Sequence, residues 1–281
     1  MIIDYVPPEV LERPKSKTVE AEVFYIEPSI VRPSVRYGGA ATGETAAVYS
    51  PQRVRITSAR EFRPTLDRQG FALVQHTSKV RDYEDEEELI TVGRNEAATI
   101  VQAATGASNV YVFDHTVRRH APDAARQPSI RVHNDYTAAS AKQRVRDFFG
   151  ETGASLTFAF INVWRPIKHP AVDRPLAFLD ARSVAPGDLV ATELVYPDRR
   201  GETYSVTANP QHRWSYFPDV TTGEALMIKC ADTRDGVAKF TPHTSFDNPL
   251  APPDAPPRES VEFRAIAFFQ EKRPVNIGQL R

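Results

Sequence analysis

The second half of the chain is a series of short apolar segments separated by turn residues, and this pattern strongly constrains the fold. The chain has 281 residues with 23 prolines and only 13 glycines. Proline is found at the ends and edges of strands and in turns. Several short strands at this spacing are typical of a sandwich or barrel, so we expect a mainly β protein. The candidate strands are 157–164, 188–196, 203–208, 213–217, 224–230, 239–241 and 260–269.

Two helices and four further strands are expected in the first half. Residues 95–105 should form a helix that begins at Asn95, because asparagine is a good N-cap and Gly106 follows the segment. Residues 138–149 have the apolar periodicity of a second helix. The further candidate strands are 20–26, 70–74, 110–113 and 130–136. We expect one domain over residues 1–281, with an irregular N-terminal extension over about 1–70 and a β core over about 110–270.

Composition excludes several classes of partner. The formal net charge is −1 and lysines and arginines form no run, which argues against nucleic acid. The single cysteine, Cys230, allows no intrachain disulfide and is expected in a strand core. The N-terminus has no signal-peptide pattern and no segment has membrane-spanning length. We therefore expect a cytoplasmic protein without a membrane or nucleic-acid partner, and a homodimer is compatible with the sequence.

The segment Ile130–Tyr136 (IRVHNDY) contains a candidate pair of metal ligands. Residues two apart on a strand project from the same face, so His133 and Asp135 should present an imidazole and a carboxylate together. A site with two histidines and one carboxylate, as in non-haem iron enzymes, needs such a pair. A hydrogen-bonded or solvated His and Asp at a strand end is the alternative.

The third ligand should come from the strand-rich half, where His212 and His243 are the candidates. We favour His243, because Arg258 and Ser260 follow it at the head of the last strand and share one face. A guanidinium binds a carboxylate with two parallel hydrogen bonds, and a hydroxyl adds a third. This pair suits a dicarboxylic cosubstrate, with Arg264 on the same strand as the alternative cation.

The order H-x-D, histidine, R-x-S resembles that of the Fe(II)/2-oxoglutarate-dependent dioxygenases. Three further stretches are similar to one group within that superfamily, the family of the fungal gibberellin desaturase, the AsaB-like hydroxylase/desaturases and CmcJ. The resemblance covers about residues 70–270. The stretches are 162–166 (NVWRP), 212–218 (HRWSYFP) and 242–246 (PHTSF) together with 258–262 (RESVE).

This resemblance implies a double-stranded β-helix, a cupin-like jelly roll with flanking helices. It implies that His133, Asp135 and His243 hold Fe(II), and that Arg258 and Ser260 bind the far carboxylate of 2-oxoglutarate. Dioxygen would be the second cosubstrate. The expected activity is hydroxylation or desaturation of a small molecule in specialised-metabolite biosynthesis, with decarboxylation of 2-oxoglutarate to succinate. Related halogenases lack the carboxylate ligand, so Asp135 argues against halogenation.

Substrate or pocket contacts are expected from a second group of residues. Asn162 and Trp164 share a strand face with aromatic residues, and Arg165 at the end of that strand could bind a carboxylate. The alternative for the aromatic members is a core position. The group comprises Asn162, Trp164, Arg165, Tyr204, His212 and Tyr216.

Two other function classes stay open at this point. The first is a metal-dependent enzyme without redox chemistry, such as a cupin-type isomerase or hydrolase that uses zinc. Tetrahedral zinc would leave one exchangeable position at a three-ligand site, whereas octahedral iron leaves three. The second is a jelly-roll binding module without catalysis, against which the full set of ligand and anchor residues argues.

Overall fold

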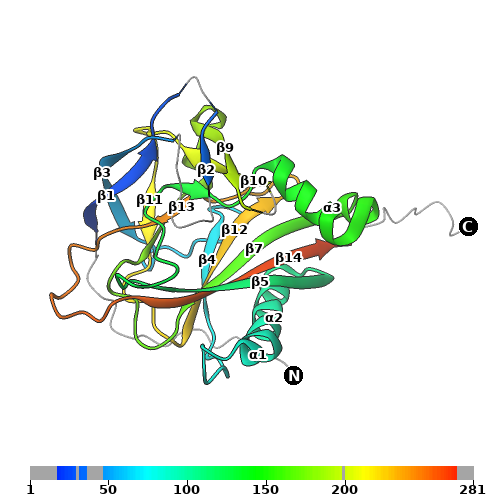
Figure 1. The fold of residues 1–281 in the computed structure, drawn as a ribbon, viewed down its shortest axis with the longest axis horizontal. Helices are drawn as coiled ribbons and strands as arrows, with labels where there is room; N and C mark the ends of the chain where they lie inside the picture. Colours follow the sequence, from blue (N-terminus) through cyan, green and yellow to red (C-terminus); the bar gives the residue numbers. More distant parts are fainter. Residues whose placement is uncertain (1–17, 30–31, 37–46, 198–199, 271–281) are drawn as a thin grey trace, which may run out of the picture.

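Two facing sheets form the body of the protein (Figure 1). The computed structural model describes residues 18–29, 32–36, 47–197 and 200–270. In these residues a nine-stranded sheet packs against a five-stranded sheet, and the Phe71 and Phe178 rings of opposite sheets stack with centroids 4.8 Å apart. This arrangement is the double-stranded β-helix that the resemblance implied, so the expectation of a mainly β jelly roll is confirmed.

The nine-stranded sheet has the order β1-β3-β11-β8-β13-β6-β10-β9-β2. Its central strands β13 and β6 are very short and lie next to each other in antiparallel register. The strands are β1 (Val19–Ile26), β2 (Ser34–Arg36), β3 (Tyr49–Ser58), β6 (His133–Asn134), β8 (Leu176–Leu179), β9 (Leu189–Val195), β10 (Arg200–Val206), β11 (Trp214–Tyr216) and β13 (His243–Ser245).

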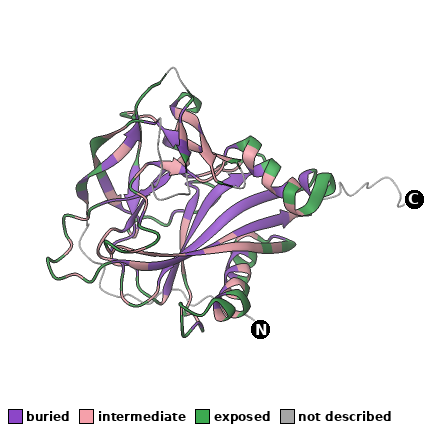
Figure 2. Cartoon of the chain, in the orientation of Figure 1, coloured by how far each residue is buried: buried purple, intermediate pink, exposed green. Residues whose placement is uncertain are grey.

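The five-stranded sheet has the order β4-β12-β7-β14-β5 and is antiparallel throughout. Its three middle strands are almost completely buried (Figure 2), because both faces are covered. Alternate residues therefore face opposite cores. Phe158, Phe160 and Trp164 of β7 pack toward the nine-stranded sheet, whereas Ile161 and Val163 pack against a helix. The strands are β4 (Phe71–Gln75), β5 (Asn109–Arg119), β7 (Thr157–Pro166), β12 (Glu224–Asp232) and β14 (Glu259–Phe269).

The helix on the outer face begins earlier than expected. Helix α1 (Glu86–Glu88), a π-helical turn η1 (Leu89–Gly93) and α2 (Arg94–Thr105) run on continuously. The expected start at Asn95 is wrong, because the Asp85 carboxylate accepts the backbone N–H groups of Glu87 and Glu88 and caps the helix there. Helix α2 packs on β5, β14 and β7, so it covers the outer core.

Helix α3 (Ala138–Ala154) follows the H-x-D motif directly. Thr137 and Ser140 form a capping box at its start, and the side chain of Ser140 also donates to the Glu202 carbonyl oxygen at 2.7 Å. The helix continues past the expected end at residue 149, with a break at Gly150, whose φ is 66°. Short 3-10 turns occur at Ala181–Ser183 and Pro186–Asp188.

The N-terminal seventy residues contain regular structure, so the expectation of an irregular extension is wrong for the described part. Strand β1 pairs with β3, and β3 continues the nine-stranded sheet through parallel pairing with β11. Residues 1–17, 30–31 and 37–46 lie outside the described residues. The single-domain organisation stays a prediction. No helix in the described residues is long and apolar enough to cross a membrane.

Two of the strands expected near the site differ from those observed. Only His133 and Asn134 of the expected strand 130–136 belong to a ladder, apart from a single bridge between Arg131 and Phe24. The expected strand 239–241 does not form, and the pairing begins instead at His243. Strand β8, between them in sequence, was missed because the four apolar residues 176–179 carry no alternation.

Candidate metal and carboxylate site

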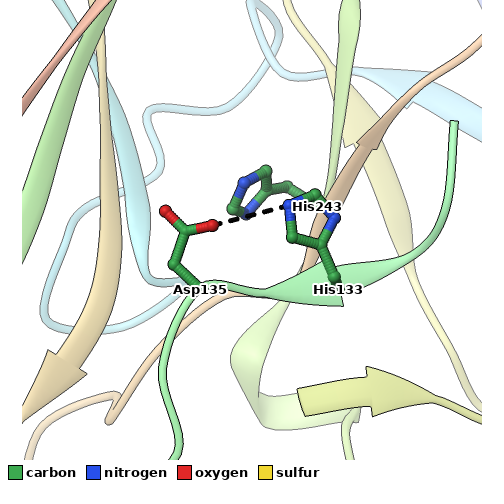
Figure 3. Close-up of side chains that lie close together, drawn as sticks. All are labelled: His133, Asp135 and His243. Carbon is green, nitrogen blue, oxygen red and sulfur yellow. Dashed lines mark ion pairs between the residues drawn. The ribbon is translucent and has the colours of Figure 1, made fainter. Parts of the chain in front are cut away.

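His133, Asp135 and His243 converge between the two sheets (Figure 3). His133 and His243 are direct neighbours across β6 and β13, and their ring centroids are 4.7 Å apart. The Nε2 atom of His133 lies 3.5 Å from Oδ1 of Asp135. One ligand atom from each residue lies within 4.8 Å of the other two. These three side chains could hold one metal ion on one face of an octahedron.

Backbone carbonyl oxygens orient both imidazole rings. The Nδ1 atom of His133 donates to the Arg131 carbonyl oxygen at 2.8 Å, and that of His243 donates to the Thr241 carbonyl oxygen at 3.2 Å. Each acceptor is two residues before its histidine, so local chain geometry sets both contacts. Such bonds fix the tautomer and leave Nε2 unprotonated for a metal.

The two oxygens of Asp135 have different surroundings. Oδ1 faces His133, whereas Oδ2 accepts a hydrogen bond from Asn162 Nδ2 at 2.7 Å and lies 3.7 Å from the Cys230 thiol. The β12–β7 register shifts at Cys230, and this bulge turns the thiol toward the carboxylate. The Cys230 carbonyl oxygen accepts a further bond, at 2.8 Å, from the side chain of Asn134 in the H-x-D motif.

The electrostatics favour the metal-binding protonation state. Burial raises the pKa of Asp135, but its neighbours His133, His243 and Arg264 stabilise the charged form and hold that pKa well below its usual range. Burial, assisted by His133, lowers the pKa of His243. A charged carboxylate and a neutral imidazole are the forms that coordinate metals.

Arg258 and Ser260 carry buried polar atoms without partners. Arg258 is 1% exposed and donates from Nη1 to the Arg174 carbonyl oxygen at 2.6 Å, but its Nε has no acceptor among the described residues. The hydroxyl of Ser260 is also buried and unpaired there. Burial lowers the pKa of Arg258 to about 9. Unsatisfied buried donors are rare, and a bound carboxylate would satisfy these two.

One cavity joins the three ligands to Arg258. Trp164 forms part of its wall, and the Arg258 guanidinium lies over the Trp164 ring at 5.6 Å from the centroid. The sequence interpretation missed Arg118 and Glu262, although Glu262 continues the alternation of Arg258 and Ser260 along β14. The lining residues are Arg118, Ser129, His133, Asp135, Trp164, Leu176, His243, Thr244, Ser245, Arg258, Glu262 and Arg264.

Arg264, which the sequence offered as the alternative cation, already has acidic residues as partners for its guanidinium. Its Nη1 donates to Asp114 at 2.8 Å and its Nη2 donates to Glu262 at 2.6 Å. Its Nε lies 4.0 Å from Oδ2 of Asp135. These negative charges raise its pKa although the side chain is buried. Arg264 is therefore a support for Asp135 rather than a free anion site.

His212 and Tyr216 do not reach the cavity, contrary to expectation. The Nε2 atom of His212 donates to the Asp188 carboxylate at 3.1 Å, and its Nδ1 lies 2.8 Å from the Tyr25 hydroxyl oxygen. The His212 ring also stacks on the Tyr25 ring. Tyr216 is 1% exposed and packs edge-on against Phe246 in the core of the nine-stranded sheet. Pairing of β11 with β8 and β3 holds this segment away from β6.

Arg165 and Tyr204 also lie outside the cavity lining. Arg165 follows the inward-facing Trp164 and so projects to the other face of β7. There it donates to the carbonyl oxygen of His76 at 2.9 Å and to that of Thr222. Tyr204 packs against Phe240 at a centroid distance of 5.7 Å. Of the expected pocket residues, Trp164 lines the cavity and Asn162 contacts Asp135.

Comparison with known proteins places this site in a family. The family model described as "Oxidoreductase/YMDC permease-like domain" matches residues 23–268. The hydroxylase/desaturase efuI of Hormonema carpetanum is 31% identical over 271 residues, covering 85% of this chain and 90% of efuI. The chain belongs to this hydroxylase/desaturase family. The Fe(II)/2-oxoglutarate-dependent dioxygenase nvfI of Aspergillus novofumigatus is 28% identical, covering 89% of this chain and 96% of nvfI.

A solved structure supports the same assignment. The iron and alpha-ketoglutarate-dependent endoperoxidase NvfI superimposes with a TM-score of 0.81 at 25% identity, covering 90% of this chain and 98% of that one. The hydroxylase/desaturase described here is thus an Fe(II)/2-oxoglutarate-dependent dioxygenase, an enzyme whose class uses Fe(II), 2-oxoglutarate and dioxygen. The expectation of a redox enzyme of this family is confirmed, in preference to a non-redox enzyme or a binding module.

Proposed function

We propose that this hydroxylase/desaturase binds Fe(II) through His133, Asp135 and His243, and the far carboxylate of 2-oxoglutarate through Arg258 and Ser260. The observation that carries the proposal is one cavity in which a three-ligand cluster and a buried arginine with an unsatisfied donor occur together. The donor set fits the group: two neutral imidazoles and one carboxylate suit a divalent iron, and a guanidinium with a hydroxyl suits a carboxylate.

The protein's own residues bind and orient the reacting groups, and they exclude water from the cavity. Iron and 2-oxoglutarate, when bound, supply the oxidising power for C–H oxidation, with succinate and carbon dioxide as coproducts. Thr241 and Arg131 orient the imidazoles through their carbonyl oxygens, and Asn162 orients the Asp135 carboxylate. The buried Trp164 forms part of the wall that keeps water from the far end of the cavity.

We propose a small molecule as the primary substrate, oxidised by hydroxylation or desaturation in the formation of a specialised metabolite. The names of the relatives support this class, since they include a hydroxylase/desaturase and an endoperoxidase. The cytoplasmic location, the absence of a nucleic-acid partner and the homodimer stay predictions.

The first test is an anaerobic titration of the purified protein with Fe(II) and 2-oxoglutarate, followed by admission of air. We expect a visible charge-transfer band on joint binding, then succinate formation that requires both iron and dioxygen. His133→Ala and Asp135→Ala should abolish the band and the succinate, because each removes a ligand from a three-ligand site. Arg258→Gln should shift the band to much higher 2-oxoglutarate concentration.

His169→Ala is the matched control for the histidine variants. His169 lies near the surface, where its Nδ1 contacts the Pro170 carbonyl oxygen at 3.2 Å, and it does not line the cavity. It should behave as wild type. Succinate formation that survives in both His133→Ala and Asp135→Ala would rule out the proposed iron site.

A further inference from the structure

A second arginine that forms no ion pair among the described residues lines the cavity. Arg118 lies on β5 directly opposite Ser260 of β14, and Arg118 lines the same cavity as Arg258. Directly paired residues of antiparallel strands project from the same face of the sheet. Arg118, Ser260 and, two residues earlier on β14, Arg258 therefore project into the same end of the barrel.

The charges in this cavity do not balance. Arg264 is paired with Asp114 and Glu262. Among the described residues, the Arg118 side chain donates from Nη1 to the Gln127 carbonyl oxygen at 3.0 Å, and the Arg258 side chain donates to the Arg174 carbonyl oxygen. The Asp173 carboxylate accepts the backbone N–H of Arg258 at 3.1 Å and not its guanidinium. Neither Arg118 nor Arg258 forms an ion pair within 4.0 Å in the part of the chain that the structure describes. Glu262 and Asp173 carry negative charge nearby, but Glu262 is paired with Arg264 and Asp173 with His120. Neither guanidinium therefore has a carboxylate of its own among the described residues.

The two guanidinium groups are close enough to act on each other. Burial and then the charge of Arg118 lower the pKa of Arg258, and burial lowers that of Arg118. Burying like charges together is unfavourable unless an anion compensates them. The Ser260 hydroxyl and Arg258 Nε are also buried without partners among the described residues, and Ser260 is the residue that pairs with Arg118 across β14 and β5.

We propose that Arg118, Arg258 and Ser260 together form the binding site for the distal carboxylate of 2-oxoglutarate, with Arg118 as its second guanidinium. This inference rests on the proposed function and adds one residue to it. A dicarboxylic 2-oxo acid is the expected ligand class, because two cations select for a carboxylate at this end beyond the 2-oxo acid group. The R-x-S motif by itself accounts for only one of the two cations.

Arg119 offers a matched control at the next position. It projects to the opposite face of β5, where it pairs with Glu84 and, at 2.9 Å, with Glu259. Arg119→Gln and Arg118→Gln remove the same charge from adjacent positions of one strand. A long-range effect of net charge would appear in both variants, whereas a contact with the ligand would appear only in Arg118→Gln.

The experiment is calorimetric titration of the Fe(II)-loaded protein under nitrogen, with 2-oxoglutarate and with pyruvate. Pyruvate keeps the 2-oxo acid group but lacks the distal carboxylate. We expect Arg118→Gln to weaken 2-oxoglutarate binding by about tenfold or more, the usual effect of losing a charged hydrogen bond, and to leave pyruvate binding unchanged. Arg118→Lys should retain part of the affinity, and Arg119→Gln should match wild type for both ligands.

The outcomes separate this inference from the proposed function. Wild-type affinity of Arg118→Gln for 2-oxoglutarate, with loss in Arg258→Gln, would overturn the role of Arg118 alone. Equal loss of 2-oxoglutarate and pyruvate affinity would also overturn it, because the effect would then not concern the distal carboxylate. A rise only in the KM for a primary substrate would assign Arg118 to that substrate instead. Wild-type protein that binds no 2-oxoglutarate would refute the proposed function itself.

Discussion

At the scale of the residue, the carboxylate of Asp135 shows how the site is prepared. Its Oδ2 is engaged by Asn162 and approached by Cys230, so Oδ1 is the oxygen directed at the histidines. Asn162 is 1% exposed and its own Oδ1 has no partner among the described residues, so its amide has no competing role in the fold there. Residues that hold a metal ligand in this way commonly affect metal affinity strongly.

We therefore predict that Asn162→Leu lowers Fe(II) affinity by roughly 10- to 100-fold, because the carboxylate loses the bond that fixes its orientation. Leucine has a similar volume, so the fold should persist. Anaerobic Fe(II) titration measures the effect, and circular dichroism checks the fold. Cys230→Ser, which keeps a donor near Oδ2, should change the affinity far less. An unchanged affinity in Asn162→Leu would contradict the orienting role.

At the scale of the element, the alternation of residues along strands places the charged groups in the cavity. Close packing between segments fixes the position of the histidines. Gly70, just before β4, lies against the segment that leads into β13. Its φ is +93°, and a Cβ there would lie 2.8 Å from Thr241 Cβ and 3.0 Å from the Phe240 carbonyl oxygen. Thr241 in turn supplies the carbonyl oxygen that orients His243. Gly70 thus packs against the residue that orients His243, one of the three candidate metal ligands.

Gly70→Ala should lower the free energy of unfolding by about 2 kcal/mol, because alanine is strained at positive φ and would clash with this segment. We also expect weaker Fe(II) binding, since the displaced Thr241 no longer fixes the His243 ring. Thermal unfolding and metal titration measure the two effects. Gly187→Ala is the control, because a Cβ there meets nothing within 4 Å. Equal behaviour of the two variants would count against the explanation.

At the scale of the whole molecule, an ion pair ties the two sheets together. Arg60 follows β3 of the nine-stranded sheet, and Glu224 begins β12 of the five-stranded sheet. The guanidinium makes two hydrogen bonds to the carboxylate, at 2.8 and 2.9 Å. Burial raises the pKa of Glu224, but the hydrogen bonds from Arg60 and from the Thr221 backbone outweigh it and lower the pKa overall.

This shift has a defined sign. The folded-state pKa of Glu224 lies below the unfolded value of 4.5, so its contribution is present above that pH and is lost as the pH falls through the folded value. Glu224→Gln should therefore be less stable than wild type by about 2 kcal/mol at pH 7, and the difference should shrink on acidification. Urea unfolding at a series of pH values measures it. The exposed Glu61→Gln serves as the control, and a difference for Glu224→Gln that stays constant with pH would contradict the linkage.

Local patterns in the sequence determined the type of fold and the chemical identity of the site. The short apolar segments predicted the β architecture, and the two-residue spacing of His133 and Asp135, and of Arg258 and Ser260, predicted which side chains share a face. These features follow from strand geometry, which acts over neighbouring residues. The motif order then selected His243 over His212, and the family resemblance supplied the cosubstrate.

Only the tertiary structure decided which distant groups meet. His243 faces His133 because β13 pairs with β6, whereas β11 carries the motif of His212 to another part of the sheet. No local pattern marks Arg118, and the strand pattern marked Asn162 as a pocket residue without its contact to Asp135. Both roles depend on the register of β5 and β7 against β14. The register of paired strands and the balance of charges in the cavity depend on segments more than a hundred residues apart. No short stretch of sequence contains that information.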